Sequence, residues 1–341
     1  MTKIDIFSGF LGAGKTTLIK KLIKEAYAGE KVVLIENEFG EIGIDGGFLA
    51  DAGIEITEMN SGCICCSLVG DFATALAKVL DEYKPDRVII EPSGVGKLSD
   101  VIRAAKTAEE HGAVLNCFTT VADVNKCKMY MKNFGEFYND QIANASAIVL
   151  SHTQSAKDFK IAECVELLRT HNANAVIVTT PWDDLDGKDI LAAMEHEDTL
   201  EAAIKELEHE HHHHHHDHEE HEHHHEHDEH CECGCHDHDH EHHHHHHHAD
   251  EVFTSFGRET VKKYTKDSIT EILKRLEDEK TYGFILRAKG IVECECGKWI
   301  HFDYVPGEPD VRIGSSSNIG KVCVIGSKIN EKAIAELFGL E

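Results

Sequence analysis

The sequence lacks an excess of positive charge, and it lacks long hydrophobic runs. Of its 341 residues, 62 are Asp or Glu and only 34 are Lys or Arg, and no basic stripe occurs. Because phosphate contacts need clustered basic side chains, we expect neither a nucleic acid nor a membrane surface as a main partner. No run of about 18 apolar residues is present. Residues 1–9 lead into a strand-like stretch without a charged leader, which predicts a cytoplasmic protein.

The cysteines lack the even spread of a disulfide framework. Most of the 12 fall into three short clusters, at 63–66, 231–235 and 294–296. In a reducing compartment, clusters of this kind indicate metal or redox chemistry rather than structural disulfides.

Histidine is concentrated in one segment. Residues 209–248 contain 24 of the 29 histidines, together with 12 acidic residues. Such a tract cannot bury enough apolar surface to offset its conformational entropy, so we expect disorder without metal. Neutral imidazoles among carboxylates suit Zn²⁺, Ni²⁺ or Co²⁺, although a low-complexity linker with incidental metal binding is an alternative.

The rest of the chain predicts two folded units. Residues 1–195 alternate short apolar runs with helical patterns, which is typical of a doubly wound, mostly parallel α/β sheet. Residues 196–250 are expected to form an acidic helix and the His/Asp/Glu-rich metal-binding linker. Residues 251–341 are expected to form a small α+β domain.

The strongest motif is GFLGAGKTT at residues 9–17, between a predicted strand and a predicted helix. It fits the P-loop pattern, in which backbone N–H groups of the glycine-rich turn surround phosphates. The Lys15 side chain reaches the β- and γ-phosphates, and the Thr16 hydroxyl binds Mg²⁺. The other expected phosphate-binding residues are Gly9, Gly12, Gly14 and Thr17.

Two acidic segments follow core strands. In EPSG at residues 91–94, Glu91 ends a strand and is placed to act on Mg²⁺ or its waters, while Gly94 can present its N–H to the γ-phosphate. The segment 36–45 contains Glu36, Glu41 and Asp45, and is either a γ-phosphate sensor or a plain solvated loop.

The motif GCICC at residues 62–66 places three cysteines at the predicted start of a helix. The helix dipole favours thiolates there, and Cys63, Cys65 and Cys66 are candidate ligands for Zn²⁺. A buried cluster of small residues and a redox pair are the alternatives.

Together, GFLGAGKTT, ENEFG, GCICC and EPSG, with the terminal small domain, resemble the CobW-type metallochaperone GTPases, relatives of the nickel-insertion GTPases of hydrogenase and urease. The resemblance implies GTP and Mg²⁺ as ligands, Zn²⁺ as the most frequent cargo, and a metalloprotein client. It also implies that Lys15 and Thr16 bind phosphate and Mg²⁺, that Glu91 is Walker-B-like, and that the GCICC cysteines bind metal. Glu36 and Glu41 are candidate accessory ligands.

The chain departs from this family where guanine is selected. The expected N-K-x-D is replaced by SHTQ at residues 151–154. An Asp carboxylate accepts two hydrogen bonds from guanine, whereas Gln154 offers one neutral acceptor and a donor, so relaxed base selectivity is expected.

The sequence leaves three alternative functions open. The first is a histidine-rich metal store, and the second is a nickel or cobalt insertion GTPase. The third is a P-loop kinase, which the absence of a lid-like arginine cluster disfavours. Cys294 and Cys296, with His301 nearby, are either a second metal site or packed side chains of one strand.

Overall fold

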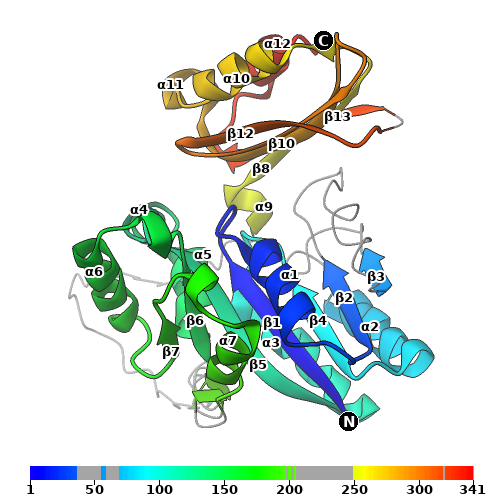
Figure 1. Cartoon of the computed structure of the whole chain (residues 1–341), viewed down its shortest axis with the longest axis vertical. Coiled ribbons are helices and arrows are strands. Elements are labelled where there is room, and N and C mark those ends of the chain that lie inside the picture. Colours follow the sequence, from blue (N-terminus) through cyan, green and yellow to red (C-terminus); the bar gives the residue numbers. More distant parts are fainter. Residues whose placement is uncertain are drawn as a thin grey trace, which may run out of the picture.

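The computed structural model describes residues 1–36, 55–58, 69–196, 199–200, 203–204, 249–317 and 319–340. Two sheets, one in each half of the chain, organise this part of the molecule (Figure 1). The N-terminal sheet has seven parallel strands in the order β3-β2-β4-β1-β5-β6-β7. These are β1 (Thr2–Gly9), β2 (Val32–Glu36), β3 (Glu55–Glu58), β4 (Arg87–Glu91), β5 (Ala113–Asp123), β6 (Ala147–Ser151) and β7 (Val176–Val178).

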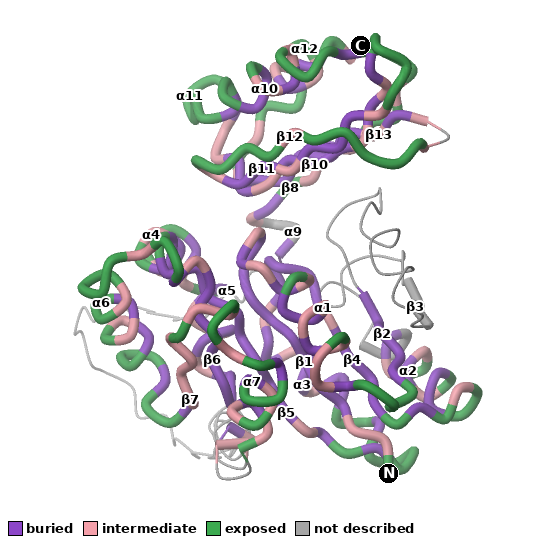
Figure 2. The backbone as a smooth tube through the Cα atoms, in the orientation of Figure 1, coloured by how far each residue is buried: buried purple, intermediate pink, exposed green. Residues whose placement is uncertain are grey.

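Helices cover both faces of this sheet, because its central strands are apolar on both sides. One face packs against α1 (Lys15–Glu25) and α7 (Gly187–Met194). The other packs against α2 (Val69–Tyr83), α3 (Leu98–Lys106), α4 (Cys127–Asn133), α5 (Gly135–Ala143) and α6 (Asp158–Arg169). The strands are the most deeply buried part of the domain, as expected for a doubly wound α/β fold (Figure 2).

The C-terminal sheet is mainly antiparallel, in the order β12-β11-β10-β13-β8, with β9 paired in parallel with β10. Its strands are β8 (Thr254–Thr260), β9 (Lys263–Tyr264), β10 (Phe284–Cys294), β11 (Trp299–Val305), β12 (Glu308–Gly314) and β13 (Gly320–Ser327). The helices are α10 (Lys266–Arg275), α11 (Glu279–Tyr282) and α12 (Glu331–Phe338), and the short α9 (Ala249–Val252) precedes β8. The three later helices lie on the side of the sheet away from the N-terminal domain (Figure 1).

These features confirm the predicted fold class, a parallel α/β domain followed by a small α+β domain. Several elements were not predicted: β3, β8, β12, α4 and α5. β12 carries Pro309 and is almost entirely exposed, so it lacks the apolar alternation that identifies a strand in sequence. Among the described residues, no helix is long and apolar enough to cross a membrane.

The two domains share part of their core. Phe134, which follows α4, lies 5.4 Å from Phe253 and 5.3 Å from Phe284 between ring centroids. Leu286 of β10 and Ile325 of β13 belong to the same buried cluster. Since the carboxyl ends of β1 and its neighbours point toward the C-terminal domain, the loops that follow these strands lie where the domains meet (Figure 1).

Candidate functional site: a phosphate cradle between two domains

The loop between β1 and α1 has the form of a phosphate cradle. Gly14 has φ +99°, a left-handed conformation that glycine adopts without strain, and α1 begins at the next residue. Lys15 is buried, and its Nζ donates to the backbone oxygens of Gly9 at 2.8 Å and Phe10 at 3.3 Å. The ammonium group is therefore held across the loop, beside the N–H groups that a phosphate would contact.

Glu91 meets the cradle from the neighbouring strand. The Thr16 hydroxyl donates to the Glu91 carboxylate, with Oγ1 at 3.0 Å from Oε1 and 3.3 Å from Oε2. A hydroxyl and a carboxylate at the start of a P-loop helix are the oxygen donors that Mg²⁺ prefers, so these two residues fit the ion. Mg²⁺ bound there would neutralise charge on the phosphates.

Gly94 lies directly against the P-loop. A Cβ added to this residue would come within 2.9 Å of the backbone nitrogen of Leu11. Only glycine therefore allows the turn after β4 to approach the phosphate loop this closely, which is consistent with the predicted contact between its N–H and the γ-phosphate.

A cavity of about 490 Å³ opens above the cradle. Its N-terminal wall is formed by the P-loop, Glu91, Lys20 of α1 and His152. Its opposite wall comes from the C-terminal domain, including Arg287 of β10 and Arg312 of β12.

A second cavity of about 310 Å³ lies beside it and shares Gly14, Thr17 and His152 with the first. It is lined by Gln154, the last residue of the SHTQ sequence, and by Trp182 and Asp183 from the turn after β7. The indole Nε1 of Trp182 donates to the Leu150 backbone oxygen at 2.9 Å, which fixes the ring beside the P-loop. The two cavities adjoin at the P-loop, and the second lies on the side of the SHTQ sequence, where a base was expected.

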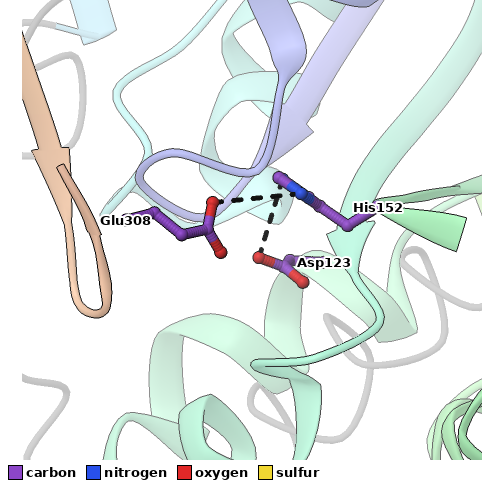
Figure 3. Close-up of side chains that lie close together, drawn as sticks. All are labelled: Asp123, His152 and Glu308. Carbon is purple, nitrogen blue, oxygen red and sulfur yellow. Dashed lines mark ion pairs between the residues drawn. The ribbon is translucent and has the colours of Figure 1, made fainter. Parts of the chain in front are cut away.

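A group of charged side chains connects the domains beside His152. Glu308, at the start of β12, has its Oε2 3.9 Å from Nδ1 of His152, and Asp123, at the end of β5, has its Oδ2 3.8 Å from Nε2 (Figure 3). Lys126 Nζ lies 3.0 Å from Glu308 Oε1 and 3.5 Å from Asp123 Oδ2. Although an imidazole and two carboxylates resemble metal ligands, the Lys126 ammonium already supplies the cation. We therefore interpret the group as an ion-pair link between the domains.

Other predicted site residues fall outside the described part of the chain: Cys63, Cys65, Cys66, Glu41 and the histidine tract 209–248. In sequence, Glu41 lies between β2 and β3, and the three cysteines lie between β3 and α2. Glu36 ends β2, is buried, and is in register with Glu91 of β4 and with Glu58 of β3. Three acidic residues thus end three adjacent strands.

Cys294 and Cys296 are joined by a disulfide at the turn between β10 and β11. His301 is buried, and its Nε2 lies 2.8 Å from the Ser315 backbone oxygen. In this state the two sulfurs offer no thiolate to a metal.

Sequence reasoning missed Lys20, Trp182, Asp183, Arg287 and Arg312 as cavity residues. Trp182 and Asp183 follow the last strand of a parallel sheet, and ligands bind at the carboxyl ends of such strands, so their position was a usable signal. The two arginines come from another domain, and only its packing reveals them.

A strand, a glycine-rich loop and a helix around a phosphate-sized cavity, with an acidic residue ending the next strand, define a P-loop nucleotide-binding protein. Residues 3–179 match the family model described as "CobW/HypB/UreG, nucleotide-binding domain". This match covers more than half of the 341 residues, and the chain belongs to that family. The resemblance inferred from the motifs is thereby confirmed.

Curated relatives include two proteins of Escherichia coli (strain K12). The zinc chaperone YeiR is 36% identical over 152 residues, which cover 44% of this chain and 46% of YeiR. The zinc chaperone YjiA is 30% identical over 190 residues, covering 54% of this chain and 58% of YjiA. The chain thus spans about half the length of these relatives. The crystal structure of the Zn(II)-bound YjiA GTPase from E. coli aligns with a TM-score of 0.43 and 21% identity, covering 100% of this chain and 99% of that one.

Proposed function

We propose that the protein is a GTP-hydrolysing metallochaperone. It binds a divalent transition metal, preferably zinc, at Cys63, Cys65 and Cys66, and it delivers this metal to a client protein. The observation that carries the proposal is the contact between the Thr16 hydroxyl and the Glu91 carboxylate, 3.0 Å apart at the floor of the phosphate cavity. It joins the two elements that a Mg²⁺-dependent P-loop hydrolase needs.

The nucleotide part rests on family membership and on the two adjoining cavities. Lys15 neutralises phosphate charge, and the positive end of α1 adds to it. Glu91 holds the Thr16 hydroxyl in place, so that this oxygen faces the Mg²⁺ position before a nucleotide arrives. Hydrolysis in such a site depends on positioning and electrostatic stabilisation of the transferring phosphoryl group.

The metal part rests on the cysteine chemistry and on the names of the relatives. Three thiolates within four positions suit zinc, and YeiR and YjiA are both named zinc chaperones. Nickel and cobalt remain the alternative cargo, since histidine-rich segments bind them as well.

The backbone supports coupling between the two parts. The chain leaves β2 at Glu36, which pairs in register with Glu91, the residue that contacts Thr16. The segment that leads to the cysteines therefore starts beside the phosphate site. In the proposal, bound GTP orders this segment into one metal geometry and hydrolysis relaxes it. The tract 209–248 raises the local metal concentration as a tethered reservoir.

Two measurements on the full chain test the proposal. The first is Mg²⁺-dependent GTP hydrolysis by the protein and by Lys15→Ala, which is expected to lose nucleotide binding. The second is the absorption spectrum of Co²⁺ used as a probe for zinc, because thiolate ligands produce charge-transfer bands that imidazole and carboxylate ligands do not. The comparison is made in a Cys231→Ser/Cys233→Ser/Cys235→Ser background, because the histidine tract itself contains these three thiols. Weakening or loss of the bands on Cys65→Ser in that background assigns the site to the GCICC cysteines. Hydrolysis that survives in Lys15→Ala, or thiolate bands that Cys65→Ser leaves unchanged in that background, would contradict the proposal.

A further inference from the structure

One wall of the cavity above the P-loop comes from the C-terminal domain. Its lining includes Arg287 of β10 and Arg312 of β12, which face the cavity that also contains Lys15 and Thr16. The arginines are at least 270 residues from the P-loop in sequence, and they belong to the other sheet. Their place in this cavity is not required by the P-loop fold, so it calls for a separate explanation.

The C-terminal domain contacts the P-loop itself. A Cβ added to Gly12 would lie 2.1 Å from Cγ1 of Val305, the last residue of β11. Three residues further along, Glu308 pairs with Lys126 of the N-terminal domain and lies near His152, as Figure 3 shows for the histidine. The turn between β11 and β12 thus contacts the N-terminal domain at two points, the phosphate loop and the residues that follow β5 and β6. The strand that carries Arg312 continues from this turn.

Both arginines are paired with acidic neighbours from their own domain. Arg287 Nη2 lies 2.9 Å from Asp303 Oδ2, and Arg312 forms an ion pair with Asp310. The side chains of Arg287 and Arg312 are 19% and 44% exposed, so both are accessible to solvent. Such carboxylates orient a guanidinium group and balance its charge when no phosphate is bound.

A nucleoside triphosphate carries more negative charge than a single carboxylate. The planar guanidinium fork matches phosphate oxygens with two parallel hydrogen bonds. Lys15 and Lys20 lie on the near wall of the cavity, and the far wall carries the two arginines beside the carboxylates of Asp303, Glu308 and Asp310. Bound phosphates would take the place of Asp303 and Asp310 as the partners of the two guanidinium groups.

We propose that Arg287 and Arg312 bind the phosphate chain of the nucleotide, so that the nucleotide site is built from both domains. This inference rests on the proposed function, because it assumes a nucleoside triphosphate in the P-loop cavity. As a consequence, the C-terminal domain responds directly to the state of the nucleotide. Loss of the γ-phosphate changes contacts made by the C-terminal domain itself, without relay through the segment 37–54.

The test compares two double variants of the full chain. Arg287→Ala/Arg312→Ala removes both cavity arginines. Arg258→Ala/Arg275→Ala is the matched control, because these two arginines are exposed, lie on β8 and α10, and are absent from the cavity lining. The measurement is the dissociation constant of a fluorescent, non-hydrolysable GTP analogue with Mg²⁺, at one salt concentration.

We expect the cavity variant to bind the analogue at least about tenfold more weakly. The reason is that losing one hydrogen bond to a charged group typically lowers the affinity by about that factor. The control is expected to bind within about twofold of the original protein. Unchanged affinity in the cavity variant would overturn the inference.

Two further measurements separate the possible failures. If the alanine variant does not fold, Arg287→Lys/Arg312→Lys keeps the charge and removes the fork, and it must still weaken binding several-fold. Unchanged affinity there would also overturn the inference. If the original chain binds no analogue, the proposed function itself is wrong. If the chain binds it and only Lys15→Ala loses it, the proposed function stands and the role of the arginines is refuted.

Discussion

The amino-terminal end of the large sheet contains a buried ion network, and it supports a prediction of large effect. The Arg87 side chain is 2% exposed and forms ion pairs with Asp5, which is 0% exposed, and with Glu30 and Glu195. Arg87 opens β4 and Asp5 lies in β1, so the pair joins two central strands of the sheet. The perturbation is Arg87→Met, which keeps much of the volume and removes the charge.

The expected cost follows from what the variant leaves behind. Burial already raises the pKa of Asp5, although Arg87 and hydrogen bonds from Asn116 and Tyr27 oppose the shift. Without the guanidinium group, a fully buried carboxylate loses its compensating charge. Breaking a buried ion pair in this way typically costs about 3–5 kcal/mol in the free energy of unfolding. Asp5→Asn in the same chain should recover part of that loss, because the remaining buried group is then neutral.

The matched control is Lys3→Met. The Lys3 ammonium pairs with Glu195, but these side chains are 42% and 25% exposed, so solvent screens the interaction and the loss should be about 0–1 kcal/mol. The assay is urea unfolding in a Trp299→Phe background. Since the chain has two tryptophans, Trp182 then reports on the N-terminal domain alone. A loss in Arg87→Met no greater than that in Lys3→Met would refute the reasoning.

Three further predictions concern the base cavity, a buried carboxyl group and the P-loop contact. Gln154→Asp restores a double acceptor for guanine, so the preference for GTP over ATP in competition binding should rise at least about tenfold; an unchanged ratio would mean that Gln154 does not contact the base. Burial raises the pKa of Asp140 despite its hydrogen bonds from Ser99, so its contribution to stability is fully present below about pH 4 and declines as pH rises through the raised pKa. Urea unfolding from pH 4 to 8 should therefore show a decline in the original protein that Asp140→Asn lacks, and parallel profiles would contradict this. Gly94→Ala places a Cβ 2.9 Å from the Leu11 nitrogen and should weaken GTP binding at least about tenfold. Gly112→Ala strains the backbone at φ +77° but meets no atom within 4 Å, so it should cost stability and leave GTP binding unchanged; equal affinities of the two variants would refute the close contact.

The fold was predictable where short-range pattern and burial agree. The strands Arg87–Glu91 and Ala147–Ser151 can be recognised from sequence because each is a short run of mainly apolar residues that is almost wholly buried in the parallel sheet. Glu55–Glu58 was missed because two of its four residues are acidic, and its place at the sheet edge comes from pairing with β2. Long-range pairing of this kind leaves little trace in local sequence.

The candidate site also contains residues that local sequence predicts and residues that depend on long-range packing. The residues around Lys15 and Thr16 were identified from sequence because the phosphate cradle is built from consecutive residues. Glu91 was recognisable because it ends a core strand. Arg287 and Arg312 could not be recognised, since their side chains reach the cavity only through the packing of one domain on the other. Asp183 is an intermediate case, because the sheet topology places its loop correctly without specifying which side chain faces the base cavity.

The measurement that tests the central claim most directly is the zinc affinity of the chain without residues 209–248, which would otherwise bind zinc themselves, determined by competition with a chelator. It is made with a non-hydrolysable GTP analogue, with GDP and without nucleotide, and Cys65→Ser provides the control. The account predicts a tight site whose affinity changes between the analogue and GDP and which is absent in the control. Equal zinc affinity in all three nucleotide states would contradict the coupling of GTP hydrolysis to metal loading and release.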